Sequence, residues 1–301
     1  MNSPGAGRFA PSPSGELHVG NLRTAMLAWL FARSTSREFL VRIEDLDRSR
    51  AGAEAAQLAE LAAVGIDWDH EPVRQSDRLP LYQQAIESLQ AAGLLYECYC
   101  TRRDIAEAAT APHSLPGSYP GTCRNLSKAA TPEQDGQRHD RPPALRLRSE
   151  VTSWTIEDQL QGSYTGPVDD LVIVRSDGVP AYNLAVVIDD AAQGIDQVVR
   201  GDDLLSSTPR QAYLAGLLGL TPPRYAHVPL ALNKDGRRLA KRDGAVTLES
   251  LAGKGLGPER VRDLILRSAG LPAGTLAGAL EAFDPAGLPR EAWVVEPGEL
   301  S

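Results

Sequence analysis

Two short stretches of the sequence hold residue types that can bind phosphate, and the first spans residues 9–25. Its sequence is FAPSPSGELHVGNLRTA, so prolines and glycines precede a run of apolar residues at helical spacing, with His18 the only imidazole. A helix that begins near Gly20 would point its backbone N–H groups and its positive dipole end at an anion. His18 could add a hydrogen bond to phosphate, although a single histidine in this position is also compatible with a structural role.

The second stretch, residues 233–244, is a basic loop with the sequence NKDGRRLAKRDG. Its Asp-Gly pairs predict turns near both ends. Between residues 200 and 242 eight basic residues face only three acidic ones, whereas the whole chain has a net charge of −8. Lys241 in such a loop suits the charge that develops on a leaving pyrophosphate, and a solvated basic surface is the alternative.

Strands and helices alternate along most of the chain, which predicts an α/β sheet with crossover connections. Residues 37–47 alternate like a strand, with Phe39, Val41 and Ile43 on one face. The apolar run at residues 184–191, LAVVIDDA, also predicts a strand. Further strands are expected at residues 144–148 and 171–174, and helices at residues 20–34, 51–66, 79–97 and 207–220.

Composition narrows the class of protein. Hydrophobic residues make up 42% of the chain, but none of the apolar runs is long enough to span a membrane. The N-terminal residues lack the basic start and apolar core of a secretory signal, and three cysteines are too few for a disulfide framework. We therefore expect a cytoplasmic protein without a membrane partner.

The three cysteines are candidates for a metal site. Cys98 and Cys100 are two positions apart, and Cys123 follows within a segment that is rich in proline and weakly periodic. Thiols in such a segment favour zinc, which would stabilise an insertion with a thin core of its own. From residue types alone, His113 is the expected fourth ligand, and three buried thiols without a metal are the alternative.

Together, the two phosphate-binding stretches resemble the paired signatures of class I aminoacyl-tRNA synthetases. HVGN resembles the HIGH tetrapeptide and RLAKR resembles KMSKS, while RFAPSPSG, RIEDLD and VVRGDDLLSSTPRQ are similar to the glutamyl/glutaminyl branch over about residues 7–250. Two departures stand out. Asn21 occupies the last position of HIGH. In the second signature Arg238 replaces the first lysine and Ala240 the serine, while Lys241 is retained.

The resemblance implies an α/β fold with a Rossmann-like parallel-sheet catalytic domain of the class I type, made of residues 1–96 and 186–245. A zinc-containing insertion would span residues 97–185, and a short helical part residues 246–301. ATP would enter with Mg²⁺. The implied ATP-binding residues are His18, Gly20, Asn21 and Lys241, of which His18 and Lys241 would be catalytic.

For the amino acid, the resemblance implies that L-glutamate is bound by groups of opposite charge. Arg8 and Arg200 would meet its carboxylates, Glu44 its ammonium group, and Tyr182 would add a hydroxyl. Without the resemblance, Glu44 would be interpreted as a surface acid at the end of a strand. The backbone and side chains that would line the pocket belong to Phe9, Ala10, Pro11 and Ser12.

For the metal, the family pattern Cys-x-Cys…Tyr-x-x-x-Cys implies one structural Zn²⁺ with a tyrosine among its ligands. His113 or a water molecule is the alternative to that tyrosine. The implied ligands are Cys98, Cys100, Tyr119 and Cys123.

The chain is shorter than a full glutamyl-tRNA synthetase, and this difference in length bears on which acceptor the resemblance implies. The sequence continues for only 60 residues after Lys241, so the resemblance implies no anticodon-binding domain. Paralogues of this length activate glutamate as its adenylate and attach it to queuosine in the anticodon of tRNA(Asp), and we expect a monomer with these partners. The alternatives are a truncated glutamyl-tRNA synthetase that charges a tRNA 3′ end, and a non-enzymatic RNA-binding paralogue.

Overall fold

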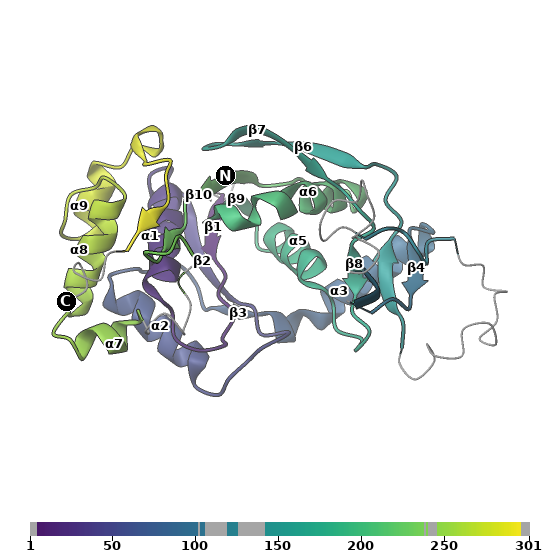
Figure 1. The fold of residues 1–301 in the computed structure, drawn as a ribbon, viewed down its shortest axis with the longest axis horizontal. Helices are drawn as coiled ribbons and strands as arrows, with labels where there is room; N and C mark the ends of the chain where they lie inside the picture. Colours follow the sequence, from purple (N-terminus) through teal and green to yellow (C-terminus); the bar gives the residue numbers. More distant parts are fainter. Residues whose placement is uncertain are drawn as a thin grey trace.

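A seven-stranded sheet forms the centre of the molecule (Figure 1). The computed structural model describes residues 5–101, 103–105, 119–125, 142–237, 239 and 246–295. Neighbouring strands are parallel except for the last pair, which is antiparallel. In spatial order the strands are β3 (Val73–Arg74), β2 (Glu38–Ile43), β1 (Ala6–Phe9), β9 (Ile195–Gly201), β10 (Arg224–Val228), β6 (Ser153–Asp158) and β7 (Gly162–Pro167). The strand predicted within residues 37–47 is thus confirmed as β2.

One face of the sheet is covered by α1 (Val19–Arg33) and by helices from the end of the chain. Most residues of α1 are buried, because the helix packs on β1, β2 and β9 with one side and on α8 and α9 with the other. Phe39, Val41 and Ile43 join the same core cluster, as their alternation predicts. The other helices near this face are α2 (Ala53–Ala63), α7 (Leu248–Ala252), α8 (Pro258–Ser268) and α9 (Leu276–Glu281).

The opposite face is covered by α5 (Tyr182–Ala192) and α6 (Thr208–Leu217), with α3 (Leu79–Ala91) packed against α5. The strand predicted at residues 184–191 is therefore wrong, because these residues form most of α5. Leu184, Ala185, Val186 and Val187 are all buried, since α5 lies among β9, α3 and α6. Burial on several sides produces a continuous apolar run, which a helix and a buried strand share.

A second sheet, antiparallel and three-stranded, lies at the opposite end of the molecule from α7, α8 and α9 (Figure 1). It consists of β4 (Leu95–Cys98), β5 (Ala144–Leu147) and β8 (Val172–Val174), so the strands expected at residues 144–148 and 171–174 are both present. Between β5 and β8 the chain returns to the main sheet as β6 and β7. The segment expected as an insertion thus also supplies the strand that ends in Asp158.

The C-terminal helices are joined to the centre by a short parallel pair of strands, β11 (Ala231–Leu232) and β12 (Trp293–Val294). Within the described ranges, none of the helices combines the length and the apolar character that crossing a bilayer would require. Three short 3₁₀ helices complete the described elements: η1 (Gln75–Arg78), η3 (Asp202–Ser207) and η5 (Pro285–Gly287).

Candidate active site

Polar side chains occupy the carboxyl ends of five neighbouring strands, and we call them the strand-end row. The strand order reverses between β1 and β9, which is where open α/β sheets bind ligands. Apolar residues two positions earlier on β1, β2 and β9 form a small core cluster, so the three arginines of the row share one face of the sheet. In spatial order the row is Arg42 (β2), Arg8 (β1), Arg200 (β9), His227 (β10) and Asp158 (β6).

Asp190, near the end of α5, joins two of these arginines. Its Oδ1 accepts hydrogen bonds from Arg8 Nε at 3.2 Å and from Arg42 Nη1 at 2.8 Å. Arg42 Nη1 also donates to Gln193 Oε1 at 2.9 Å. Burial raises the pKa of Asp190, but Arg8 and Arg42 outweigh it and hold that pKa below its ordinary value. Asp190 is therefore ionised and fixes the position of Arg8.

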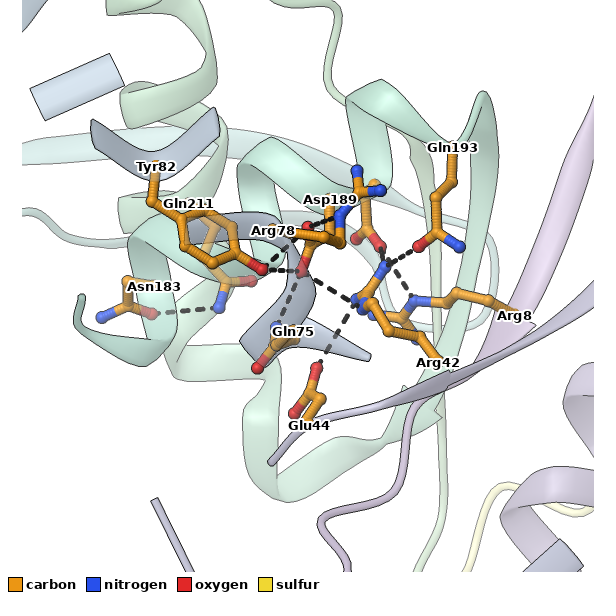
Figure 2. A network of polar contacts seen from close by, with 11 residues as sticks. Arg8, Arg42, Glu44, Gln75, Arg78, Tyr82, Asn183, Asp189, Gln193 and Gln211 are labelled. Carbon is orange, nitrogen blue, oxygen red and sulfur yellow. Dashed lines mark hydrogen bonds and ion pairs between the residues drawn. The ribbon is translucent and has the colours of Figure 1, made fainter. Parts of the chain in front are cut away.

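The preceding residue, Asp189, connects the arginine cluster to two neighbouring elements (Figure 2). Its carboxylate is fully buried and accepts hydrogen bonds from Gln75 Nε2 at 2.8 Å and from Arg78 Nε at 2.6 Å. Tyr82 Oη donates to both of its oxygens, at 3.0 and 2.9 Å. Arg42 Nε lies 3.6 Å away. Asp189 thus ties η1 and α3 to α5, and it keeps the arginine cluster in one arrangement.

Glu44 lies where β2 leaves the sheet, with its Oε1 3.5 Å from Arg42 Nη2. Burial raises the pKa of this carboxyl above its ordinary value, and the positive charges of Arg42 and Arg8 compensate for only part of that effect. A further cation would therefore stabilise the ionised form of Glu44. This is the behaviour expected of a group that receives an ammonium ion.

Arg200 is held by a different set of partners on the other side of the switch point. Its Nε donates to His227 Nε2 at 3.1 Å, and its Nη2 donates to Thr208 Oγ1 at 2.8 Å. The guanidinium carbon lies 5.6 Å from the centre of the Tyr225 ring. Arg200, His227 and Thr208 are all buried.

Both arginines beside the switch point keep nitrogens available. Within the described part of the chain, Arg8 makes a hydrogen bond only through Nε, and Arg200 only through Nε and Nη2. Each of the two residues is only 5% exposed. Buried guanidinium groups with unpaired N–H groups are suited to a carboxylate. The structure thus brings Arg8 and Arg200 together as predicted, on neighbouring strands.

The proline-rich loop after β1 is held by hydrogen bonds to its backbone. Gln57 of α2 donates to the carbonyl groups of Ser12 at 3.0 Å and of Gly15 at 2.6 Å. The carbonyl of Pro11 accepts the N–H of Glu44 at 2.9 Å. The loop therefore places Ser12 and Glu44 next to each other, and Phe9 and Ala10 lie at its start.

A cavity of about 600 Å³ begins beside this loop and extends to the cysteines. Ser12, Glu44 and Tyr182 line one end, whereas Cys98 and Cys100 line the other. Tyr182 begins α5 and is 42% exposed, and the charges of Glu44, Arg200 and Arg8 all act on its hydroxyl. Three of the predicted glutamate-binding residues, Ser12, Glu44 and Tyr182, thus line one end of a single cavity, and the charges of Arg8 and Arg200 reach Tyr182 there.

The predicted ATP-binding helix begins with a reciprocal cap. His18 Nδ1 accepts the N–H of Asn21 at 3.2 Å, and Asn21 Oδ1 accepts the N–H of His18 at 3.2 Å. This capping box gives a structural reason for Asn21 at the last position of the HIGH-like tetrapeptide. A Cβ atom on Gly20 would lie 3.0 Å from the His18 ring, so the glycine leaves room for the imidazole.

Both ends of the basic loop lie beside this helix. Residues 238 and 240–245, which include Lys241, lie outside the described residues. After the loop, the carbonyl of Val246 accepts the N–H of Val19 at 2.9 Å, and Thr247 forms an isolated β-bridge with His18. Before it, the Ala231 side chain lies 3.3 Å from the position of a Cβ on Gly20. The described residues that flank the second signature in the sequence therefore lie beside the start of α1, which holds the first signature.

The cysteines converge on Tyr119. The sulfur atoms of Cys98, Cys100 and Cys123 lie within 4.8 Å of one another, with Cys100 Sγ and Cys123 Sγ 3.5 Å apart. Tyr119 Oη lies 3.4 Å from Cys98 Sγ and 3.8 Å from Cys100 Sγ. A tetrahedral zinc site with Zn–S bonds near 2.3 Å separates its sulfur ligands by about 3.8 Å. Three sulfurs and one phenol oxygen thus fit a four-coordinate ion, whereas His113 lies outside the described residues.

Sequence reasoning missed most of the groups that hold the arginines in place. Asp189 and Asp190 were placed in a strand, where they would have pointed to opposite faces. Arg42 lies within the recognised motif RIEDLD but was not assigned a role, although it alternates with the apolar residues of β2. No local pattern marks Asp158 or His227, because their pairing depends on the order of strands in the sheet.

Comparison with known proteins identifies the family of this chain. Residues 6–288 match the model of the catalytic domain of class I tRNA synthetases (E and Q). A protein of Nocardia farcinica named glutamyl-Q tRNA(Asp) synthetase is 64% identical, over 97% of this chain and 93% of its own length. A protein of Cutibacterium acnes with the same name is 52% identical, over 89% of this chain and 76% of its own.

A solved structure is similar in fold. The glutamate tRNA ligase of Elizabethkingia meningosepticum, in complex with its amino acid, superposes with a TM-score of 0.82 at 24% identity. The match covers 99% of this chain and 68% of that one. The chain therefore belongs to the class I tRNA synthetases (E and Q), and within them to the family of glutamyl-Q tRNA(Asp) synthetases.

Proposed function

We propose that this protein activates L-glutamate with ATP and transfers it to queuosine at the anticodon wobble position of tRNA(Asp). The observation that carries the proposal is the near full-length match to a relative of that name at 64% identity. The charged groups at the switch point support the amino-acid part of the proposal independently, because they provide unpaired cations and one carboxylate that needs a cation.

Glutamate would be recognised by the two arginines, which carry positive charge, and by Glu44, which carries negative charge. The free nitrogens of Arg8 and Arg200 would each donate to a carboxylate oxygen, and Glu44 would accept from the ammonium group. The Tyr182 hydroxyl would add one more hydrogen bond. Arg42 and Asp190 would not touch the substrate but would keep Arg8 in place, since they are bonded to each other and Asp190 is bonded to Arg8.

The nucleotide would lie along the start of α1. Because His18 Nδ1 accepts a backbone N–H, the proton of the neutral ring is on Nε2, which makes that nitrogen a donor for phosphate oxygens. The backbone near Gly20 and Asn21 would face the phosphates, Lys241 would neutralise the leaving pyrophosphate, and Mg²⁺ would accompany ATP.

The reaction would occur in two steps. A glutamate carboxylate oxygen attacks the α-phosphate of ATP, and the bond to pyrophosphate breaks, which yields glutamyl-adenylate and pyrophosphate. A hydroxyl of the acceptor nucleoside then attacks the acyl carbon, and AMP leaves. The protein would contribute positioning and charge stabilisation without a covalent intermediate, and each donor that stabilises the transition state is typically worth about 10²–10³ in rate.

The four-ligand centre would hold one structural Zn²⁺. Cys98, Cys100 and Cys123 supply sulfur, and Tyr119 supplies oxygen. The hydrogen bond between Cys98 and Cys123 lowers the pKa of Cys123 and raises that of Cys98, so Cys123 is the thiol of this pair that more readily forms the thiolate that binds metal. The ion would join the end of β4 to residues 119–123 and would thereby shape the far end of the cavity.

Labelled glutamate distinguishes the proposed activity from its alternatives. The protein is incubated with ATP, labelled glutamate and bulk tRNA from cells with and without queuosine. We expect label only on queuosine-containing tRNA, and the label should persist when the 3′-terminal adenosine of the tRNA has been removed enzymatically before the reaction, which leaves the hydroxyls of queuosine intact. Label that depends on an intact 3′ end would support a truncated glutamyl-tRNA synthetase, and a lack of glutamate-dependent ATP–pyrophosphate exchange would support a non-enzymatic paralogue.

Site variants test the assignment of the nucleotide-binding residues. His18→Ala and Lys241→Ala should each reduce ATP–pyrophosphate exchange by about 10²-fold or more. Lys234→Ala is the matched control, because this exposed lysine begins the same basic loop but lies outside the KMSKS-like residues. Full exchange in both site variants would refute the proposed ATP site.

A further inference from the structure

Three residues of the strand-end row form a hydrogen-bonded chain across three adjacent strands. His227 Nδ1 lies 2.6 Å from Asp158 Oδ2, and His227 Nε2 lies 3.1 Å from Arg200 Nε. The side chains of Asp158 and His227 are both fully buried. The Tyr225 ring is stacked on the His227 ring, with centres 6.1 Å apart. This series of hydrogen bonds therefore runs from Asp158 on β6 to Arg200, a proposed glutamate-binding residue.

The chemistry of Arg200 determines the proton on His227. A guanidinium N–H can only donate, so His227 Nε2 accepts in its 3.1 Å contact with Arg200 Nε. Thr208 Oγ1 lies 3.0 Å from the same nitrogen and, as a hydroxyl, can donate to it as well. The remaining ring proton of the neutral imidazole is then on Nδ1, where Asp158 Oδ2 accepts it. A proton on Nε2 would instead oppose two N–H donors across the 3.1 Å contact with Arg200.

Asp158 is suited to select this tautomer because its two oxygens have different partners. Oδ1 accepts the backbone N–H groups of Leu160 and Gln161, both at 2.9 Å. The N–H of His227 lies near both oxygens, at 3.2 and 3.1 Å. Oδ2 alone faces the imidazole. An amide at position 158 would keep its oxygen on the backbone N–H groups and would turn its NH₂ group toward His227.

We propose that His227 is a positioning residue, held in its Nδ1-protonated tautomer by Asp158, that orients Arg200 for the glutamate carboxylate. With Nε and Nη2 fixed by His227 and Thr208, the guanidinium plane is set and Nη1 is directed to the substrate. This inference deepens the proposed function and rests on it for the identity of the ligand. Neither Asp158 nor His227 would touch glutamate.

Nitrogen-15 spectra of the histidine rings test the tautomer without any assay of activity. The chain holds five histidines, and the His227→Gln spectrum identifies the signal of His227. At pH 7.5 the wild-type ring should carry its proton on Nδ1, and Asp158→Asn should move it to Nε2. A wild-type ring protonated on Nε2 would overturn the proposal.

Kinetics test the effect on Arg200. In ATP–pyrophosphate exchange, Asp158→Asn should raise the KM for glutamate about tenfold or more, with kcat and the KM for ATP nearly unchanged, because an interaction common to ground and transition states is lost. Glu157→Gln is the matched control, since it makes the same chemical change at the exposed neighbouring position of β6. It should leave all three parameters unaltered.

A double-mutant cycle separates positioning from a general structural role. His227→Gln places an amide oxygen near the position of Nε2, and the side chain no longer has tautomers for Asp158 to select. In the His227→Gln protein, Asp158→Asn should therefore cause almost no further increase in the KM for glutamate. If Asp158→Asn raises KM equally in both backgrounds, or leaves it unchanged in the wild type, the inference fails. A wild-type protein without glutamate-dependent exchange would instead refute the proposed function, while the spectra would still report on the tautomer.

Discussion

His18 and Asn21 cap the same helix turn in both directions. The imidazole Nδ1 of His18 accepts the N–H of Asn21, and the side-chain oxygen of Asn21 accepts the N–H of His18, each at 3.2 Å. The histidine that matches the first position of the HIGH signature is thus oriented by the residue that departs from its last position. Because the cap occupies Nδ1, the opposite ring nitrogen carries the proton.

Removal of the Asn21 side chain should loosen both the cap and the imidazole. We expect Asn21→Ala to lower the free energy of unfolding by about 1 kcal/mol, as for other N-terminal caps, and to reduce the rate of ATP–pyrophosphate exchange. Urea unfolding and exchange kinetics measure the two effects. Asn21→Asp keeps the acceptor oxygen and should retain the stability of the wild type, so equal loss in both variants would contradict the capping role.

Replacement of Arg42 should be among the most damaging single changes in the chain. Its buried guanidinium balances the negative charges of Asp189, Asp190 and Glu44. Arg42→Met would remove this positive charge and leave the buried carboxylates without it. We expect a loss of about 3–5 kcal/mol in the free energy of unfolding, measured by urea titration. Arg74→Met, which breaks the exposed pair with Glu54, is the control and should change little. Similar losses of unfolding free energy in Arg42→Met and Arg74→Met would show that Arg42 does not balance the buried carboxylates.

Acid should destabilise the fold through His227. Burial, assisted by Arg200, lowers the pKa of His227, and the opposing effect of Asp158 does not restore it. In the unfolded chain the pKa of histidine is about 6.5. Below that pH the unfolded state therefore binds a proton that the folded state excludes, so the free energy of unfolding decreases as the pH falls from about 6.5 toward the folded pKa.

The His227→Gln variant isolates this contribution. Urea titrations at pH 7.5 and 5.5 should show a larger loss of stability on acidification for the wild type than for the variant. The other charged groups that act on His227, namely Asp158, Arg200 and Asp202, remain in both proteins. Parallel pH profiles for the two proteins would show that His227 does not contribute.

Zinc removal should destabilise the β4–β5–β8 end of the molecule more than the nucleotide site. A tightly bound ion present at one hundred times its Kd adds about 2.7 kcal/mol to the stability of the folded state. We therefore expect a chelator to lower Tm, and Cys123→Ser to bind less than the single zinc ion of the wild type. The same chelator presaturated with zinc is the control. Metal analysis that finds no zinc in protein purified without chelators would contradict the site.

Local patterns predicted many elements because their signals depend on near neighbours in the sequence. The alternation that identified β2 and the apolar spacing that identified α1, α2, α3 and α6 are confirmed. The helix expected at residues 79–97 was too long, because α3 ends at Ala91 and residues 95–97 belong to β4. Residues 184–191 were mistaken for a strand because α5 is buried on several sides, which removes the amphipathic period on which the distinction depends. That error also hid Asp189 and Asp190, which the helix directs toward the arginines.

The sequence by itself determined which residues could act: His18, Arg8, Arg200 and Glu44 are identified by short motifs, and the cysteines by their spacing. Only the tertiary structure decided how these residues are held. Asp190 is 182 positions from Arg8, and Asp158 is 69 positions from His227, so each pair meets through strand order and helix packing rather than through local sequence. A buried charge is costly unless a group of opposite charge or a hydrogen-bond partner lies next to it in the folded protein. Such partners can come from any part of the sequence, so their positions follow no periodic pattern along the chain.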